Sequence, residues 1–486
     1  MNIIITSFEG SVDKTALERA FKGLELNLCI SVTNKREVIP DLNAKEHLWM
    51  EERPLREGHF TDTNWNTIAP LDEELIERMR PFECVFMEMV GKYVHRTRFK
   101  LSGDMPYGER RRQYFSHLRY WNDFLDTRKI NLVLMYHMPH KCYDYILYSL
   151  CKTKGIHVLY LEHLQAIDSI FVVRDWEDSV VEIGENIRRF SDEYADPEKP
   201  IPLSDNYQWY FEYFRREHPV VWYKPRQDGL VRRNFLLKWR KKALKVFKRN
   251  PRTFFQSVLS RQFWSHKLQQ HRTIRFYDDH AKLPDLSRPF VYAPLHYQPE
   301  ASTVPGAGAY ADQERVIQLI AANLPKNVAI YIKEHPAQGE RCRSIAFYKT
   351  LLAVPSVTFV PREMDTFQLI DHAVAIATGG GTAGFEGFMR QKPVLMFGHY
   401  YYQFAQGVHR IRTAEECKKA IDAIFAGKAT ISERQIRIFL KAIEECATPY
   451  PGPPDSPFEK YSQDEKTTLW AELIGRNVRQ VMALLR

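Results

Sequence analysis

The sequence predicts an α/β protein in which two doubly wound domains face a cleft. The main observation is that short apolar runs alternate with helical segments between Phe290 and Phe397, a pattern typical of parallel sheets covered by helices. A second unit of strand, loop, helix and strand lies between Asn131 and Leu161. The chain is long enough for two or more domains at 486 residues, and its 44% hydrophobic and 27% charged residues are an ordinary globular composition.

The N-terminal half begins with a buried strand at Asn2–Ser7 and then reads as polar and irregular until about Pro81. A helix is expected over Glu73–Val94, with a kink at Pro81 because proline interrupts helical hydrogen bonds. The next unit consists of a strand, a helix and a strand at Asn131–Tyr136, Tyr143–Lys154 and Ile156–Leu161. Strands joined through a helix run parallel, and the crossover is right-handed.

The C-terminal half repeats this alternation in a longer series. Strands are expected at Phe290–Leu295, Val328–Lys333, Val357–Val360, Val374–Ala377 and Pro393–Phe397. Helices are expected at Glu314–Leu324, Ile345–Ala353, Thr366–His372 and Ala383–Arg390. A Pro-rich stretch, 449–454, then leads to a C-terminal helix at Glu465–Leu485. Open α/β sheets bind ligands at the carboxyl ends of their strands, so the loops after these strands are the expected site.

The charge of the chain is uneven, and this divides it into parts. The formal net charge is +9, yet residues 229–277 hold 14 Lys and Arg and no Asp or Glu, which leaves the remainder at −5. We predict an N-terminal α/β domain (1–228), a basic amphipathic connector (229–285), a C-terminal α/β domain (286–448) and a Pro-rich linker with a final helix (449–486). A mildly acidic body with one basic insert is not a diffuse nucleic-acid-binding surface, so no nucleic acid partner is predicted.

The cysteines and the N-terminus indicate the compartment. Seven cysteines are scattered without a CxxC pair, which argues against a zinc module and a disulfide framework and favours a reducing, cytoplasmic environment. The N-terminus lacks a basic segment followed by a long apolar run, so no signal peptide is predicted. No apolar run approaches the roughly 20 residues that span a bilayer. We expect a soluble protein that contacts a membrane at most at its surface.

The first motif at a predicted strand end is Lys333-Glu-His335-Pro336. A histidine at the carboxyl end of a strand and before a proline is held in an extended turn that can point into the cleft. There its imidazole can donate to a phosphate or to a leaving oxygen. The alternative is a turn histidine that only caps the next helix.

The second motif is the run Thr378, Gly379, Gly380, Gly381 and Thr382, between a strand and a helix. It places backbone N–H groups and a hydroxyl at a helix N-terminus, which is an anion site suited to phosphate. It is neither a dinucleotide fingerprint nor a Walker loop, and this disfavours a dehydrogenase and an NTPase. A glycine turn needed only for tight helix packing is the alternative.

The third motif, Pro294-Leu-His-Tyr-Gln-Pro-Glu300, places His296, Gln298 and Glu300 after the strand that begins at Phe290. A carboxylate at Glu300 can act as a general base or attack the anomeric carbon of a sugar. Equally, it can accept hydrogen bonds from substrate hydroxyls or from the backbone.

Together these motifs resemble the bacterial capsule polysaccharide biosynthesis proteins, a group that includes β-Kdo transferases. The resemblance covers roughly Phe290–Phe397, and Asp312-Gln313 belongs to it. It implies a GT-B-like fold of two Rossmann-like domains, with a nucleotide-sugar, typically CMP-activated, in the C-terminal domain. In that group the histidine of the His-Pro motif and a hydroxyl-bearing loop hold the cytidylate phosphate, roles that carry over to His335, Thr378 and Thr382.

The resemblance also suggests roles for residues near the loop. Lys333 and His335 are expected to offset the charge of the leaving group. Glu386, on the helix that the loop opens, is a candidate ribose ligand or simply a first-turn acid favoured by the helix dipole. His399 and the tyrosines 400–402 are interpreted as an ordinary surface loop, with the acceptor side as the second choice.

In the N-terminal half, His137, His140 and Asp144 cluster after the strand Asn131–Tyr136. Their spacing fits no strong zinc signature, and GT-B enzymes typically need no metal, so no metal ion is predicted. An acceptor-binding loop is the preferred functional interpretation, with Asp144 or Glu162 as an alternative base. A structural role is the other interpretation.

The basic stretch 231–267 intersperses aromatic and aliphatic residues among its cations. Such a segment can lie on anionic lipid headgroups. The two alternatives to lipid binding are that the segment binds an acidic glycan or that it is simply a solvated helical face.

The resulting prediction is a cytoplasmic glycosyltransferase, peripheral at the inner membrane, which moves a sugar from a nucleotide-sugar donor to a bacterial surface polysaccharide or glycolipid. A CMP-sugar such as CMP-Kdo is the favoured donor, and retention or inversion is open. No cofactor and no metal are predicted. The expected catalytic residues are Glu300, His335 and Lys333, and the expected donor ligands are His296, Gln298, Thr378, Gly379, Gly380, Gly381, Thr382 and Glu386. The alternatives are a nucleotide-sugar epimerase of the same fold and a non-catalytic protein that binds glycans or polyanions.

Overall fold

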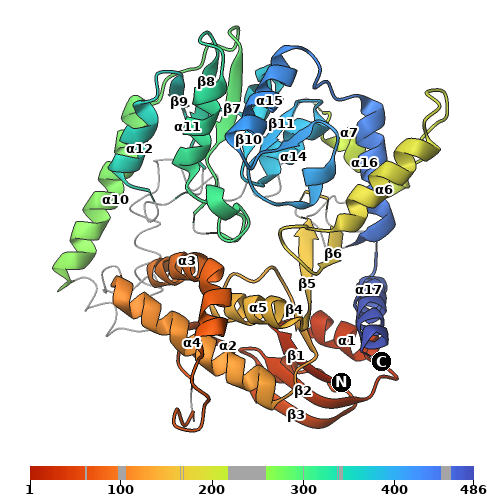
Figure 1. Ribbon diagram of the computed structural model, residues 1–486. Helices are drawn as coiled ribbons and strands as arrows, with labels where there is room; N and C mark the ends of the chain where they lie inside the picture. The colour runs from red at the N-terminus through yellow and green to blue at the C-terminus, as the bar shows by residue number, and fades with distance from the viewer. Residues whose placement is uncertain are drawn as a thin grey trace.

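Two sheets form two α/β halves, one above the other in Figure 1. The computed structural model describes residues 1–60, 63–96, 105–164, 166–167, 169–216, 259–298, 300–335, 338, 343–449 and 461–485. Two doubly wound halves and a C-terminal helix confirm the predicted fold class. The predicted boundary at residue 228, most of the basic stretch 231–267 and most of the Pro-rich stretch 449–454 lie outside the described residues.

The N-terminal sheet has seven strands in the order β13-β6-β5-β4-β1-β2-β3. Five of them are parallel: β1 (Asn2–Thr6), β2 (Leu26–Val32), β3 (Ala44–Met50), β4 (Leu132–Met135) and β5 (His157–Leu164). At one edge, β6 (Ser169–Val173) runs antiparallel to β5 and to the short β13 (Thr448–Pro449). The parallel pair β4 and β5 confirms the crossover predicted from the sequence.

The prediction of an irregular region up to Pro81 was wrong, because this region supplies the strands β2 and β3, the helices α1 (Ser11–Ala20) and α2 (Glu52–Arg56) and the start of α3 (Glu73–Arg96). The strand β2 is almost wholly buried and its apolar run was a usable signal. The strand β3 is an edge strand with mostly exposed side chains, and its identity comes from pairing with β2 rather than from apolar alternation. The short helix α2 follows it.

Alternating residues of the central strands enter two different cores, as the two-residue period of a strand requires. Ile3 and Ile5 face a core formed with α1 (Ser11–Ala20) and α17 (Gln463–Leu484), whereas Ile4 faces a core formed with three other helices. These three helices are α3 (Glu73–Arg96), α4 (Tyr107–Thr127) and α5 (Tyr143–Lys154). The sheet is therefore covered on both faces, which is where parallel sheets occur.

The C-terminal sheet is parallel throughout and has the strand order β12-β11-β10-β7-β8-β9. Its strands are β7 (Phe290–Pro294), β8 (Ala329–Lys333), β9 (Val357–Val360), β10 (Ala375–Thr378), β11 (Val394–Met396) and β12 (Val408–Arg410). Its helices are α10 (Arg261–His280), α11 (Gln313–Asn323), α12 (Ile345–Leu352), α13 (Thr366–His372), α14 (Thr382–Met389) and α15 (Ala414–Phe425). The predicted series of strands and helices is confirmed here, with ends shifted by one or two residues.

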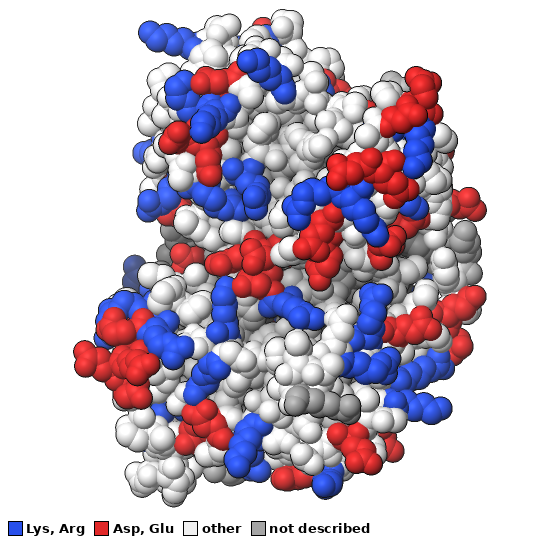
Figure 2. Space-filling view, turned by 45° about the vertical axis from the view of Figure 1, so that its right-hand side comes forward, with Lys and Arg blue, Asp and Glu red and all other residues white. Residues whose placement is uncertain are grey.

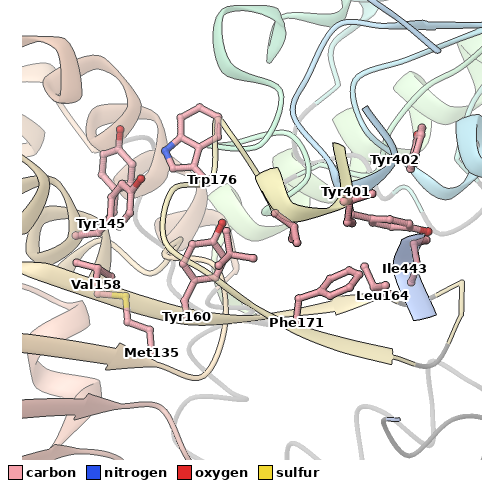
Figure 3. Packing of buried hydrophobic residues seen from close by; sticks show 14 of the residues in the cluster. Met135, Tyr145, Val158, Tyr160, Leu164, Phe171, Trp176, Tyr401, Tyr402 and Ile443 are labelled. Carbon is pink, nitrogen blue, oxygen red and sulfur yellow. The ribbon is translucent and has the colours of Figure 1, made fainter. Parts of the chain in front are cut away.

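The two halves share one continuous hydrophobic core. The end of β5, residues 161–164, extends past the last residue of β4 that pairs with it, and with β6 it forms an arm that reaches the upper half (Figure 1). Figure 3 shows Tyr160, Leu164 and Phe171 of this arm beside Tyr401 and other residues from the C-terminal part of the chain. The Phe171 and Tyr401 ring centroids are 6.4 Å apart. Burial of these aromatic side chains joins the halves.

Three helices complete this junction on the right of Figure 1. They are α6 (Val181–Glu193), α7 (Asp205–Tyr213) and α16 (Glu433–Cys446), and α16 contacts both of the others. The chain then returns to the N-terminal half, where α17 packs along α1 and brings the two termini close together (Figure 1). The C-terminal helix is thus part of the N-terminal core, with Ile474 only 1% exposed.

The packing of α17 predicts a stability effect. Ile474→Ala should lower the free energy of unfolding by about 2–5 kcal/mol, because it removes buried methyl groups and leaves a cavity. Glu472→Ala on the exposed side of the same helix should change it by less than about 0.5 kcal/mol. Urea unfolding followed by circular dichroism measures both. Equal losses in the two variants would contradict the role of this helix in the core.

Candidate active site

The C-terminal sheet reverses its winding between β7 and β10. The chain goes from β7 to β8 and β9 on one side, and then to β10, β11 and β12 on the other. The loops after β7 and β10 therefore meet at the carboxyl edge, which is where such sheets usually form their ligand crevice. The second and third sequence motifs are these two loops.

His296, from the loop after β7, is hydrogen-bonded directly to the glycine loop after β10. Its Nε2 accepts from the Gly379 N–H at 2.8 Å and lies 3.1 Å from the Thr378 hydroxyl. Burial, together with the charges of His335 and Arg343, lowers the pKa of His296 to about 4. The ring is therefore neutral at physiological pH, with the proton on Nδ1 because Nε2 accepts.

Thr378 closes the glycine loop from inside. Its hydroxyl oxygen accepts from the N–H groups of Gly380 at 3.1 Å and of Gly381 at 3.0 Å. Together with the bond from Gly379 to His296, this engages the N–H groups of all three glycines within the protein. An anion at this loop would therefore bind to the N–H groups of the first turn of α14, whose N-cap is Gly381.

Close packing explains the glycines of this loop. A Cβ on Gly381 would lie 2.7 Å from Cε1 of His296, and one on Gly398 would lie 1.7 Å from the Gly379 carbonyl oxygen. Gly380 has φ of +124°, which favours glycine. Tight packing, which was the alternative reason for the glycines of this motif, is therefore present. The loop also lies at the carboxyl edge of the sheet.

Lys333 and Glu386 lie beneath the loop and are 4% and 3% exposed. The Lys333 amine donates to the Met364 carbonyl at 2.5 Å and to the Thr366 hydroxyl at 2.8 Å. Burial lowers the pKa of Lys333 to about 8. Burial also raises the pKa of Glu386 to about 7, against the charge of Lys333 and a hydrogen bond from Thr382. In this structure Lys333 is bound to the residues that precede and begin α13, and Glu386 to the first residue of α14. Their contact with a donor stays a prediction.

A buried ion pair that the sequence analysis did not single out holds the loops after β7 and β8. Arg343 Nε donates to Glu334 Oε2 at 3.0 Å, and both side chains are at most 3% exposed. Arg343 also donates through Nη2 to the His296 carbonyl at 2.8 Å and through Nη1 to the Gln298 side chain. Tyr348 donates to the same Glu334 oxygen at 2.6 Å. Glu334, which precedes the His-Pro motif, was a signal in the sequence for this pair. Its partner Arg343 lies nine residues further along the chain and is recognisable only in the structure.

Gln298 and His335 lie at the same carboxyl edge. The backbone N–H of Gln298 donates to the side-chain oxygen of Gln338 at 2.8 Å, and the side-chain amide of Gln338 donates to the Gln298 carbonyl at 3.0 Å. The backbone N–H of His335 donates to Glu334 at 2.8 Å, and its half-buried ring lies 5.4 Å from that of Tyr297. The predicted residues His296, Gln298, His335 and the glycine loop are thus brought together at one edge.

Glu300 occupies a different position, exposed at the start of a turn. Its carbonyl accepts from the N–H groups of Thr303 and Val304 at 3.1 and 3.0 Å. Its charge raises the pKa of Tyr400, and so does the charge of Glu162 from the other half of the molecule. The two carboxylates therefore lie within electrostatic range of one phenol at the junction of the halves.

The interpretation of residues 399–402 as a surface loop was wrong, because they form the contact between the halves. Tyr401 and Tyr402 are fully buried, and Tyr402 donates to the Gly381 carbonyl at 2.6 Å. The Glu177 carbonyl lies 2.7 Å from His399 Nδ1 and accepts from the Gln403 amide at 3.3 Å. Several tyrosines in sequence are ambiguous between surface and core, and only the arm of β5 and β6 decides.

The N-terminal sheet has its own switch point between β1 and β4. A cavity of about 500 Å³ lies there, lined by residues of both following loops and of α17: Ser7, Glu9, Gly10, Val12, Asp13, Tyr136, His137, Lys141, Gln463 and Trp470. Lys141 Nζ is held 2.8 Å from Glu52 and 3.1 Å from the Ser7 hydroxyl. Ser7 has φ of +65°, a conformation that costs energy for a residue with a side chain.

Two further groups lie at this edge. The ligand atoms of His137, His140 and Asp144 lie within 4.8 Å of one another. Glu162, on the arm, shares its face of β5 with the buried Tyr160 and Leu164. Burial alone raises the pKa of Glu162 to about 8.

Comparison with known proteins agrees with the motifs. Residues 254–437 match the model of the family described as capsule polysaccharide biosynthesis protein, and this confirms the predicted resemblance. The match spans the C-terminal sheet and its crevice and leaves the N-terminal sheet unmatched. Together with the fold, it supports a glycosyltransferase. No curated protein matches the chain.

Several solved structures are similar in outline. The UDP-GlcNAc 2-epimerase of Methanocaldococcus jannaschii is 12% identical over 91% of this chain and 98% of its own, with a TM-score of 0.27. The β-Kdo 2,7 transferase KpsC of Thermosulfurimonas dismutans is 11% identical over 80% and 95%, with a TM-score of 0.31. A glycosyltransferase of Rickettsia africae is 10% identical over 100% and 99%, with a TM-score of 0.26. We draw no functional conclusion from likenesses at this level.

The ion pair of Glu334 and Arg343 predicts a large stability effect. Arg343→Met should lower the free energy of unfolding by about 3–5 kcal/mol, because it leaves a buried carboxylate without its partner. Arg315→Met removes an ion pair with Asp312 in which both side chains are more than 60% exposed, so it should cost at most about 1 kcal/mol. Urea unfolding measures both variants. A loss for Arg343→Met no larger than for Arg315→Met would show that the pair does not hold the two loops.

Proposed function

We propose that the chain is a glycosyltransferase that moves a sugar from a nucleotide-sugar to a bacterial surface polysaccharide or glycolipid, with a CMP-sugar such as CMP-Kdo as the donor. The observation that carries this proposal is the joining of His296 to the glycine loop at the switch point, inside the segment that matches the capsule family. The donor phosphate would bind at the first turn of α14 and at His335. Preorganised positive and N–H groups at that place stabilise a leaving phosphate.

The general base for the acceptor hydroxyl is proposed to be Glu162, in preference to Asp144 and to Glu300. Glu162 lies on the arm between the halves, and its charge, like that of Glu300, adds to the effect of burial in raising the pKa of Tyr400. Its pKa of about 8 is close to the range in which a carboxylate is an effective base. Glu300 is exposed and would bind acceptor or donor hydroxyls.

The proposed cellular setting is the cytoplasmic face of the inner membrane, where the basic stretch 231–267 would contact anionic lipid. In the described part of the chain, no helix has the length and apolarity that crossing a bilayer requires. Figure 2 shows Lys and Arg intermingled with Asp and Glu on the face in view.

Nucleotide binding tests the donor. CMP at about 100 times its dissociation constant should stabilise the protein by roughly 2.7 kcal/mol, and His335→Ala should lose this gain. Thermal unfolding with CMP, CDP, UDP and GDP measures it. His372→Ala, at an exposed helix end of the same domain, is the control and should keep the gain.

Stabilisation by UDP or GDP instead of CMP would overturn the proposed donor. No stabilisation by any nucleotide would overturn the proposed function. Turnover of a nucleotide-sugar without an acceptor and without release of nucleotide would instead indicate an epimerase.

The pH dependence tests the base. Since the carboxylate form of Glu162 is the active one, kcat/KM should rise as the pH increases through about 8. Glu162→Gln should lower kcat by about 10²- to 10⁴-fold and abolish this rise. The exposed Glu182→Gln is the control. Steady-state kinetics from pH 6 to pH 9.5 measure both variants.

Stability separates this role from a merely structural one. The folded protein holds the Glu162 proton up to about pH 8, whereas the unfolded chain releases it near pH 4.5. The free energy of unfolding therefore decreases as the pH rises from about 4.5 to about 8, because the folded protein keeps a proton that the unfolded chain has released. Glu162→Gln should accordingly be at least as stable as the natural protein at pH 8, although it is inactive. An inactive variant that is also less stable would contradict the assignment.

A further inference from the structure

A cluster of two imidazoles and one carboxylate lies outside the proposed donor site. His137 and His140 belong to the loop after β4, and Asp144 lies in the first turn of α5. One ligand atom from each is within 4.8 Å of the other two. Small rotations of the side chains would bring such atoms around a single ion.

The hydrogen bonds of the two histidines determine which nitrogen faces the cluster. The Met138 carbonyl lies 3.0 Å from His137 Nδ1 and 2.7 Å from His140 Nδ1. Because a carbonyl only accepts, both Nδ1 atoms carry the proton, and each Nε2 has a lone pair. A backbone carbonyl that binds the far N–H is the usual partner of a metal-ligating histidine, since it sets the tautomer and the orientation of the ring.

Two acceptors in the cluster are buried without a hydrogen-bond donor in the described part of the chain. They are Nε2 of His137 and Oδ2 of Asp144. The other Asp144 oxygen accepts from the Lys141 N–H at 2.6 Å, which fixes the carboxylate. Leaving such atoms without a partner costs about 1–3 kcal/mol each. Acceptors that face one another without a donor are matched by a cation.

The nearest side-chain cation is engaged elsewhere. The Lys141 amine is bound to the Glu52 carboxylate and to the Ser7 hydroxyl. Glu52 is fully buried and offsets the charge of this amine. Lys141 therefore contributes no hydrogen bond to the unpaired oxygen of Asp144.

We propose that His137, His140 and Asp144 bind a divalent transition metal ion, with zinc as the ion the ligands favour. Two neutral imidazoles and one carboxylate are a ligand set of catalytic zinc sites, which keep a fourth position open. His137 also lines the cavity of about 500 Å³ at the switch point, so the open position would accept an oxygen of a molecule bound there. This proposal revises the metal-free expectation from the sequence, and it does not depend on the proposed donor.

Metal binding to the full chain tests this site directly. The exposed Cys84 is first replaced by serine, because a thiol also binds zinc. After treatment with chelator and loading with zinc, gel filtration and elemental analysis should find about one zinc per chain, as expected for a single three-ligand site. His137→Gln and Asp144→Asn should weaken zinc binding by at least about 10-fold in competition with a chromophoric chelator. Asp144→Asn keeps the shape of the side chain and guards against a variant that fails to fold.

Cobalt supplies a second measurement on the same protein. Cobalt bound by nitrogen and oxygen in a four-coordinate site should give visible absorption bands without a thiolate charge-transfer band, and His140→Gln should abolish them. His372→Gln on the surface is the control and should bind as the natural protein does. Absence of stoichiometric zinc in the Cys84→Ser protein would overturn the site. So would a zinc affinity of the three ligand variants equal to that of the Cys84→Ser protein with all three ligands intact. Either outcome leaves the nucleotide experiments unaffected.

Discussion

The structure depends on the burial of the arm formed by β5 and β6 against the C-terminal half. A parallel sheet offers its carboxyl edge to ligands, but two such sheets need a fixed relation before their edges can act together. The arm supplies this relation, since Phe171 packs near Tyr401 and one core runs from the first strand to α16. The helix α17 closes the return path on α1. Burying large aromatic surfaces makes this junction a core rather than a polar domain contact.

Around that junction the polar groups are arranged so that the loops are rigid before any ligand binds. His296, the glycine loop and Thr378 satisfy one another, and Arg343 links the loops after β7 and β8. Such networks are stable only when every member has a partner. The edge that we propose to bind the donor therefore holds a neutral histidine and a helix N-terminus, and its charged groups Lys333 and Glu386 are buried.

The carboxyl edge of the N-terminal sheet differs in this respect. It holds a cavity, the ion pair of Lys141 with Glu52, and acceptors of His137 and Asp144 that have no donor among the described residues. This difference between the two edges is compatible with the proposed division, in which one edge binds the nucleotide and the other the acceptor. Glu162 lies between them, on the arm that joins the halves.

The sequence alone determined the alternation of strands and helices in the C-terminal half, because each strand there is a short buried apolar run bounded by turn residues. It also determined the loops at which His296, His335 and Thr378 lie, since a motif after a strand must lie at the carboxyl edge. Only the tertiary structure decided the rest. The edge strand β3 owes its conformation to pairing with β2, and Tyr401 and Tyr402 are buried because Phe171 of the arm packs near the first and Phe385 near the second. The pairing of Glu334 with Arg343 was not apparent from the sequence, and although the sequence grouped His137, His140 and Asp144, only the structure gave the distances between them and the buried acceptors that lack a donor among the described residues.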